Sequence, residues 1–102
     1  MTDKVLVGAP RAKILGELEG WAEAKGRNAI VKTFQFKSFS QAWGWMNRVA
    51  LLAEKMDHHP EWFNVYHKVV VDLVTHSVGA ISNLDFELAR MMETLAQQPV
   101  SQ

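Results

Sequence analysis

Apolar residues recur at helical spacing in three parts of the chain, and short segments typical of strands lie between these parts. In the first part, Ile14, Leu15 and Leu18 share one face of a helix predicted from Pro10 to about Gly20. Proline suits the first turn of a helix, because the N–H that it lacks has no intrahelical partner there. The first predicted element is therefore a short helix, preceded by a loose end over residues 1–9.

A strand hairpin is predicted next. Residues 29–36 are rich in β-branched and aromatic side chains, which favour strands, and residues 21–24 form a shorter candidate strand before them. The segment between them, Lys25 to Asn28, contains a glycine and is typical of a turn. We expect these two strands to pair antiparallel.

The longest predicted helix follows, capped by Ser38 or Ser40 and ending near Asp57. Pro60 sets its end, because a proline ring pushes the preceding residue out of the helical region. Its apolar side chains are Ala42, Trp43, Trp45, Met46, Val49, Ala50, Leu52, Ala53 and Met56. Projected along a helix they fill an arc of roughly 180°, wider than one helix usually needs against a sheet. Two interpretations stay open: a deeply set core helix, or a helix with part of this face against another subunit.

Two more strands and a third helix complete the pattern. Residues 62–66 and 69–75 are predicted to be strands joined by a tight turn. Ser82 and Asp85 then fit the Ser/Thr-x-x-acid pattern of a helix start. The apolar stripe of this last helix is formed by Phe86, Leu88, Ala89, Met92 and Leu95.

The predicted order of elements is α-β-β-α-β-β-α. Strands that neighbour each other along the chain favour an α+β fold, with a four-stranded antiparallel sheet and the helices packed on one face. With 102 residues and a mass of 11.6 kDa, the chain is long enough for one compact domain and too short for two. We therefore expect a single domain over residues 1–102, with loose ends at 1–9 and 97–102.

Composition and charge narrow the function classes. Hydrophobic residues make up 48% of the chain and charged residues 22%, which argues against a disordered chain. Equal numbers of acidic and basic residues, 11 of each, argue against direct binding of a nucleic-acid backbone. Without cysteine the chain has no disulfide, thiolate nucleophile or cysteine-bound metal. No segment has the length of a secretory core or a membrane span, so we expect a soluble, cytoplasmic protein without membrane contact.

Polar residues that could do chemistry gather where the middle helix gives way to the third strand. They are Glu54, Asp57, His58, His59 and Glu61, and Trp62 follows them. Histidine gives and takes protons near neutral pH, so His58 or His59 could act as an acid. His76 follows the fourth strand, whose end could approach the same junction across the sheet. The structural alternative is that these histidines are surface caps and one hydrogen-bonded core residue.

Other kinds of site are disfavoured. The chain lacks a glycine-rich phosphate loop, a Gly-x-Ser-x-Gly elbow and a His-Glu-x-x-His helix. No metal is expected, because the adjacent rings of His58 and His59 would rarely both point at one ion. Asp85 has a structural explanation as well, since an acid at the third position of a helix reaches back to its cap.

The run Glu-Lys-Met-Asp-His-His-Pro-Glu-Trp-Phe-Asn-Val-Tyr over residues 54–66, followed by Thr75, His76 and Asp85, resembles the pterin-4a-carbinolamine dehydratase family. The resemblance runs from about residue 21 to residue 95. Its His-His-Pro-Glu-Trp block, with a Thr-His at the matching distance, is highly specific. The resemblance therefore favours catalytic histidines over structural ones.

The sequence departs from the family pattern at two positions. Ala80 stands where a glycine is common, and His67 where an asparagine is frequent. Neither belongs to the catalytic set. Ala80 nevertheless puts the approach to the last helix in doubt, because alanine disfavours a positive φ.

The resemblance implies a hydro-lyase, a 4a-hydroxytetrahydrobiopterin dehydratase that acts in tetrahydrobiopterin recycling. Such an enzyme removes water from pterin-4a-carbinolamine and gives the quinonoid dihydropterin. Expelling hydroxide from C4a needs a proton donor, and forming the new double bond needs loss of the proton on N5. No cofactor is expected, because the pterin is the substrate.

Matched residue by residue, the resemblance implies three catalytic histidines, His58, His59 and His76. The positions that it assigns to the substrate pocket are Glu54, Asp57, Pro60, Trp62, Thr75 and Asp85. Our hypothesis is that His58 and His76 are the acid–base pair and that His59 holds the pterin ring. Asp85 would then orient a histidine.

The resemblance also implies assembly into a homodimer or homotetramer, through the sheet edge and the long middle helix. In animals, similar proteins also serve as dimerisation cofactors of a homeodomain transcription factor, which adds the nucleus as a location. A transcriptional coactivator is therefore the alternative function, and it is compatible with the enzyme. The residues predicted to lie at such an interface are Trp45, Leu51 and Leu52.

Overall fold

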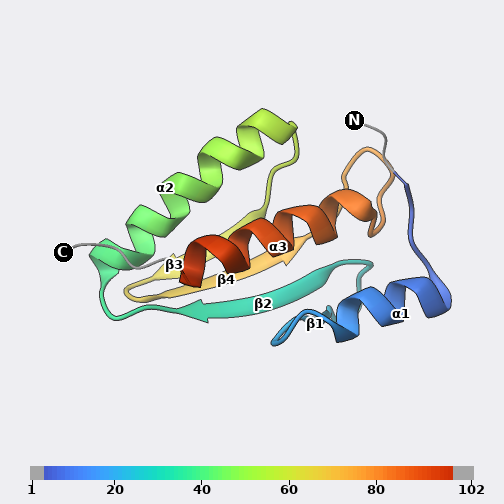
Figure 1. Cartoon of the computed structure of the whole chain (residues 1–102), viewed down its shortest axis with the longest axis horizontal. Coiled ribbons are helices and arrows are strands. Elements are labelled where there is room, and N and C mark those ends of the chain that lie inside the picture. The colour runs from blue at the N-terminus through green and yellow to red at the C-terminus, as the bar shows by residue number, and fades with distance from the viewer. Residues whose placement is uncertain (1–3, 98–102) are drawn as a thin grey trace.

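The computed structural model describes residues 4–97, which form three helices and four strands in the predicted order (Figure 1). The elements are α1 (Gly8–Gly16), β1 (Ala22–Glu23), β2 (Ile30–Gln35), α2 (Phe39–Met56), β3 (Glu61–Val65), β4 (Lys68–Leu73) and α3 (Asn83–Gln97). Helices α2 and α3 lie over one face of the sheet, and α1 lies beside β1 (Figure 1). The predicted α+β fold is confirmed.

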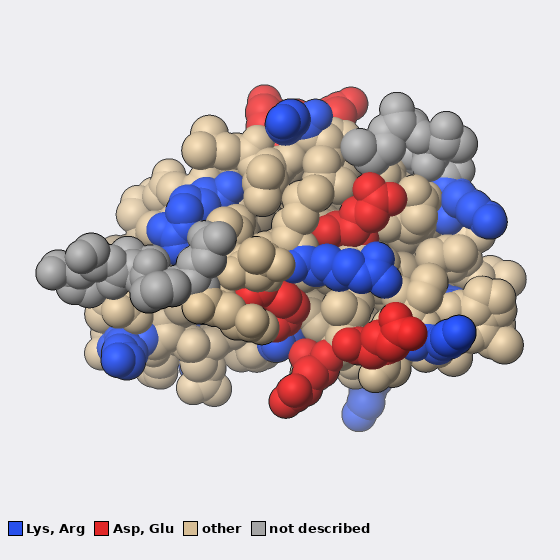
Figure 2. Space-filling model, in the orientation of Figure 1, with Lys and Arg blue, Asp and Glu red and all other residues tan. Residues whose placement is uncertain are grey.

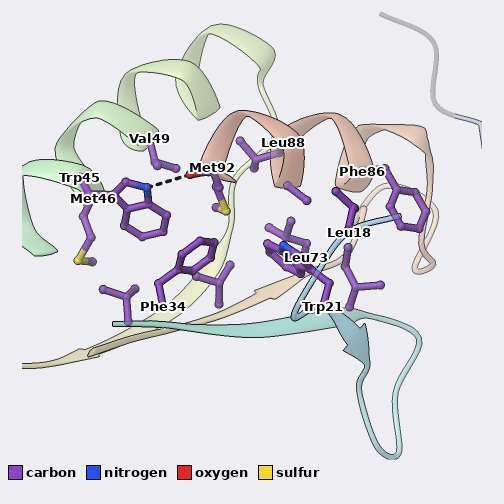
Figure 3. Packing of buried hydrophobic residues seen from close by; sticks show 14 of the residues in the cluster. Leu18, Trp21, Phe34, Trp45, Met46, Val49, Leu73, Phe86, Leu88 and Met92 are labelled. Atoms are coloured by element: carbon purple, nitrogen blue, oxygen red, sulfur yellow. Dashed lines mark hydrogen bonds between the residues drawn. The ribbon is translucent and has the colours of Figure 1, made fainter. Parts of the chain in front are cut away.

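The four strands form one antiparallel sheet in the order β1-β2-β4-β3. Side chains alternate along β4: Val69, Val71 and Leu73 are fully buried, whereas Val70 is exposed on the opposite face. The buried side chains of the sheet meet those of α2 and α3 in one hydrophobic core (Figure 3). The opposite face of the sheet is uncovered by these helices (Figure 1).

Trp45 on α2 lies in this core and not at an interface, which corrects one part of the interface prediction. Its side chain is fully buried, and its Nε1 donates a hydrogen bond to the carbonyl of Met92 at 3.1 Å (Figure 3). Its ring centroid lies 4.6 Å from that of Phe34 on β2. Trp45 therefore joins α2 to α3 and to the sheet. Of the other two predicted interface residues, Leu51 is exposed and Leu52 is half-buried.

The wide apolar arc of α2 is divided between core and surface. Its buried members are Ala42, Trp45, Met46, Val49, Ala53 and Met56. Trp43, at one edge of the arc, is 54% exposed, and its ring stacks on that of Phe39 with centroids 6.5 Å apart. Most of the arc is therefore core, and the edge with Trp43 faces solvent, so contact of this edge with another subunit stays a prediction.

Local hydrogen bonds explain where α2 begins and ends. The hydroxyl of Ser38 accepts the N–H of Gln41 at 3.1 Å, as expected of a capping serine. At the other end, Asp57 adopts the left-handed conformation with φ 52° and ψ 44°. The N–H of His58 then returns to the carbonyl of Ala53 at 3.0 Å. This closed helix end places His58 immediately beyond α2.

Helix α1 is shorter than predicted. It begins at Gly8 and ends at Gly16, not near Gly20. The N–H groups of Glu17 and Leu18 bond to carbonyls three residues earlier, at 3.1 Å each, so the chain tightens and leaves the α-helix.

The prediction that residues 1–9 form a loose end does not hold for residues 4–6, whose backbone is hydrogen-bonded to the chain at the start of α3. The N–H of Leu6 donates to the carbonyl of Ile81, and the N–H of Asn83 donates to the carbonyl of Lys4, both at 3.0 Å. The remaining parts of the predicted loose ends, residues 1–3 and 98–102, lie outside the described residues.

Charged side chains of both signs are interspersed on the face shown in Figure 2. This face therefore lacks the single-sign patch that would attract a nucleic-acid backbone. Between residues 4 and 97, the helices are too short or too polar to cross a bilayer.

Candidate active site

A cavity of about 420 Å³ opens where the end of α2, the turn after β4 and the start of α3 meet. Its lining residues are Met56, Asp57, His58, His59, Thr75, His76, Ser77 and Leu84. The volume lies within the ordinary range of small-molecule sites. Three histidines from two separate segments thus share one cavity.

His58 is nearly buried and bonds through Nε2 to Oδ1 of Asp85 at 2.8 Å. Asp85 is fully buried, and its Oδ2 accepts the backbone N–H of Ser82 at 2.8 Å and the hydroxyl of Thr75 at 2.9 Å. Because the carboxylate acts as an acceptor, His58 donates from Nε2, and Nδ1 is the ring nitrogen left for a ligand. Asp85 therefore combines the two roles considered from the sequence: it completes the cap of α3 and it orients a histidine.

His59 forms a local pair with Glu54 in the last turn of α2. The Nε2 of His59 lies 2.7 Å from Oε1 of Glu54, and the two side chains are 53% and 80% exposed. An ion pair this exposed contributes little to folding. His59 can therefore exchange this contact for one with a ligand.

His76 lies in a tight turn after β4 and not in the strand itself. The strand ends at Leu73, Thr75 then pairs with Ala80, and the carbonyl of Thr75 accepts the N–H of Gly79 at 2.8 Å. Gly79 carries the positive φ of this turn, 63°, and Ala80 does not need one. The departure from the family pattern at Ala80 is therefore compatible with the turn.

His76 is also bonded to a carboxylate, that of Glu61, and this carboxylate is itself held by an ion pair with Arg27. Nε2 of His76 lies 2.7 Å from Oε2 of Glu61, and the guanidinium of Arg27 binds the two oxygens of Glu61 at 2.7 and 3.2 Å. The hydrogen bond from Arg27, and next that from His76, lower the pKa of the Glu61 carboxyl to about 2. The pKa of the Arg27 guanidinium is in turn raised, mainly by its hydrogen bond to Glu61. Glu61 is therefore an ionised acceptor near neutral pH.

The six residues that the resemblance assigns to the pocket divide into three groups of two. Asp57 and Thr75 line the cavity, whereas Glu54 and Asp85 each contact a histidine that lines it. Pro60 and Trp62 are not among the lining residues. Trp62 points toward the helices, with its ring centroid 6.2 Å from that of Trp45. Pro60 directly follows His59 and Trp62 packs against the core.

Sequence reasoning misses Arg27 and includes Glu61 only as one member of the polar cluster. The register of the sheet supplies the signal that was lacking. Glu61 on β3 lies opposite Asp72 on β4, and two like charges in that position repel each other. Arg27 compensates both, since its Nη1 also lies 3.6 Å from Oδ2 of Asp72.

Acids and histidines of this site are arranged in pairs. Across residues 4–97, no group of three or more such side chains is placed to hold one metal ion. Each of His58, His59 and His76 instead faces a different carboxylate, at 2.7 to 2.8 Å.

The fold and this cavity together define a small α+β protein with a histidine site suited to proton transfer. The sequence pattern of the family described as pterin 4 alpha carbinolamine dehydratase matches residues 6–95. A pterin-4-alpha-carbinolamine dehydratase homologue from Jannaschia sp. (strain CCS1) is 57% identical over 91 residues, which cover 87% of this chain and 93% of the relative. Another, from Novosphingobium aromaticivorans, is 55% identical over 94 residues, with 92% and 98% covered.

Solved structures give the same result. The crystal structure of a transcriptional coactivator/pterin dehydratase from Brucella melitensis matches with a TM-score of 0.88 at 46% identity, covering 91% of this chain and 99% of that one. A pterin dehydratase-like protein, identified as a RuBisCO assembly factor in the alpha-carboxysome, shares the fold with a TM-score of 0.66 at 22% identity, covering 79% and 94%. The present chain belongs to the pterin-4-alpha-carbinolamine dehydratase family, a family of hydro-lyases.

Proposed function

We propose that this protein dehydrates pterin-4a-carbinolamine to the quinonoid dihydropterin, the reaction required in tetrahydrobiopterin recycling. The hydroxyl on C4a takes up a proton and leaves as water, N5 gives up its proton, and a double bond forms between C4a and N5. These steps need one proton donor and one acceptor and no cofactor. The observation that carries the proposal is that His58, His59 and His76 line one cavity of small-molecule size.

His58 and His76 are the proposed acid–base pair. Each bonds to a carboxylate through Nε2, which fixes the ring and leaves Nδ1 for proton transfer to or from the pterin. His76 is 62% exposed and can exchange its proton with solvent after each turnover, whereas the buried His58 is sheltered by the core.

The remaining residues hold the pterin or the histidines. His59, exposed and paired with the exposed Glu54, is suited to hold the pterin ring. Asp85 is a positioning residue for His58, and Thr75 in turn donates its hydroxyl to Asp85. Asp57 lines the cavity and can accept a hydrogen bond from the pterin.

A stopped-flow assay with freshly generated 4a-hydroxytetrahydropterin tests this proposal, after subtraction of spontaneous dehydration. His58→Ala and His76→Ala should each lower kcat by about 100-fold, as expected for proton-transfer residues. His59→Ala should mainly raise KM.

His67→Asn is the matched control, because His67 lies in the turn between β3 and β4 and is not among the cavity-lining residues. It should leave kcat unchanged. An intact kcat in His58→Ala would show that this histidine is not part of the acid–base pair. No catalysed dehydration by the unmodified protein would contradict the function as a whole.

A second candidate function is assembly through α2, with a coactivator role of the kind described for the Brucella melitensis relative. The observation that favours it is that α2 exposes large apolar side chains: Phe39 and Trp43 stack at one edge of the apolar arc, and Leu51, outside this arc, is 74% exposed. A second copy of this chain is the proposed occupant, giving a homodimer or homotetramer, and a homeodomain transcription factor is the alternative partner.

Sedimentation of Trp43→Glu and Leu51→Glu tests this assembly. Loss of the oligomer with intact dehydration would support an α2 interface. A monomeric unmodified protein would overturn the proposed self-association and leave the transcription factor as the partner to examine.

A further inference from the structure

Glu61 contacts the candidate site without lining its cavity. Its carboxylate lies on the sheet face opposite α2 and α3, because its neighbour Trp62 points toward the helices. From there it reaches His76, 2.7 Å away, in the turn after β4. An effect of Glu61 on the reaction would therefore pass through His76.

Arg27 connects this contact to the hairpin between β1 and β2. Its guanidinium holds both oxygens of Glu61, and the planar fork of arginine matches this geometry. The neighbouring Asn28 fixes the hairpin from the other side, since its Oδ1 accepts the backbone N–H of Ile81 at 3.2 Å. The hairpin is thus tied to the segment that leads into α3.

We infer that Arg27 and Glu61 are a positioning pair, which fixes the ring orientation and the tautomer of His76 for proton transfer. This inference rests on the proposed dehydration. Because Arg27 keeps Glu61 ionised, Glu61 can only accept, and Nε2 of His76 must carry a proton. Nδ1 then has the free electron pair that can take a proton from the pterin.

The ionised Glu61 also stabilises the charged ring that results when His76 takes up this proton. The proton passes from the pterin to Nδ1 of His76 and on to solvent, while Glu61 stays unprotonated throughout. His76 needs such a support more than His58 does, since its side chain is 62% exposed and packing does not hold the ring.

The chain offers a matched control in the ion pair between Arg11 and Glu23. This pair is also forked, with contacts of 3.1 and 2.9 Å, and Glu23 is 51% exposed on β1. The pair has the same chemistry, but neither residue lines the cavity and neither is bonded to a histidine in the described contacts. A general effect of losing a surface ion pair would appear in Glu23→Gln as well.

The first test compares Glu61→Gln with Glu23→Gln in the dehydration assay. Glu61→Gln should lower kcat roughly tenfold, with KM changed by less than about twofold, because a positioning residue affects the reaction and not the binding. Glu23→Gln should leave both constants unchanged. A rise in KM at constant kcat would overturn the inference, since Glu61 would then act in binding. An equal loss in both variants would overturn it too.

The second test repeats Glu61→Gln in the His76→Ala protein. If Glu61 acts only through His76, the second substitution should not lower kcat further. A further tenfold loss would show that Glu61 acts by another route and would overturn the inference. If His76→Ala alone leaves kcat intact, the proposed role of His76 fails together with that of the pair. If Glu61→Gln leaves kcat unchanged while His76→Ala lowers it, the inference about the pair is wrong but the proposed function is not contradicted.

Arg27 is tested separately with two variants. Arg27→Ala should lower kcat several-fold, and Arg27→Lys should recover part of this loss, because lysine keeps the charge but not the fork. Neither should add to the effect of Glu61→Gln. Melting temperatures should stay near that of the unmodified protein. If Arg27→Ala leaves kcat unchanged while Glu61→Gln lowers it, Arg27 does not take part in positioning His76.

Discussion

Two histidine–carboxylate pairs face the same cavity from opposite environments. In the pair of His58 and Asp85 the side chains are 5% and 0% exposed, whereas in the pair of His76 and Glu61 they are 62% and 39% exposed. The contact distances are nearly equal, 2.8 and 2.7 Å. The same arrangement of ring and acid is therefore held by burial in one case and by a second ion pair, from Arg27, in the other.

Because of this difference, the buried pair should contribute to both stability and catalysis, and the exposed pair mainly to catalysis. Asp85 is part of the fold as well as of the site, because the same carboxylate satisfies Ser82 at the start of α3. Glu61 lies at the surface, where an ion pair contributes little to folding. Substitutions in the buried pair should therefore affect folding and catalysis together, and substitutions in the exposed pair should affect catalysis alone.

Asp85→Ala should have the largest effect on stability. It leaves the N–H of Ser82, the hydroxyl of Thr75 and Nε2 of His58 without their acceptor in a buried setting, at a cost of about 3 kcal/mol in the free energy of unfolding. Urea unfolding followed by circular dichroism measures this cost. Glu61→Ala, the matched change in the exposed pair, should cost less than about 1 kcal/mol. Equal losses of stability in the two variants would show that the buried and the exposed pair do not differ in their contribution to folding.

The buried pair could be anticipated better than the exposed one. Ser82 and Asp85 form a local pattern, because an acid three positions after a capping serine can be recognised from the sequence alone. Arg27 and Glu61 are distant along the chain and meet only through the register of β3 against β4 and the position of the hairpin. Periodicity does not specify such a register, so the contacts of Glu61 with Arg27 and with His76 could not be predicted from the sequence.

Trp45 shows the same limit within a single helix. Helical periodicity correctly gives the apolar arc of α2, but it does not tell which edge of the arc packs against α3. That edge contains Trp45, whose Nε1 finds the carbonyl of Met92 on another helix. The opposite edge, with Trp43, stays exposed. Order and type of the elements thus follow from local patterns, whereas contacts between elements do not.

Thr75→Val should have the second-largest effect, and it tests how far the buried pair depends on its surroundings. The hydroxyl of Thr75 donates to Asp85 and contacts that of Ser82, so a valine of similar shape removes these bonds and little packing. We expect a loss of about 1–2 kcal/mol in the free energy of unfolding, together with a lower kcat. Thr75→Ser, which keeps the hydroxyl, is the control. An unchanged stability in Thr75→Val would show that Asp85 is held without this residue.

Asp57 ends α2 directly before His58 of the buried pair, and substitutions of Asp57 should have a smaller effect on stability than those of Thr75. Its φ of 52° lies in the left-handed region, which glycine adopts freely and alanine does not. Asp57→Ala should therefore cost about 1 kcal/mol, and Asp57→Gly should cost less or nothing. Thermal unfolding gives the comparison. Because Asp57→Gly preserves the backbone, an increase of KM in this variant would reveal a contact between the Asp57 carboxylate and the pterin.

The acid dependence of stability should show the smallest effect, and it belongs to the exposed pair. The hydrogen bond from Arg27, and next that from His76, lower the pKa of the Glu61 carboxyl from its ordinary value of 4.5 to about 2 in the folded protein. A carboxyl whose pKa falls on folding stabilises the protein above its unfolded pKa, and this contribution disappears as the pH falls toward the folded pKa. The stabilisation by Glu61 should therefore be complete above pH 4.5 and be lost between pH 4.5 and about 2. Because the group is exposed, its full size should not exceed about 1 kcal/mol.

Urea unfolding of the unmodified protein and of Glu61→Gln across this pH range measures the contribution of Glu61. The difference between the two free energies of unfolding should shrink as the pH is lowered, because a protonated glutamic acid and a glutamine are both neutral. Glu23→Gln serves as the control for a forked surface pair away from the histidines. A difference that stays constant down to pH 2 would mean that Arg27 does not hold Glu61 ionised, and the exposed pair would then lack the support that distinguishes it from the buried one.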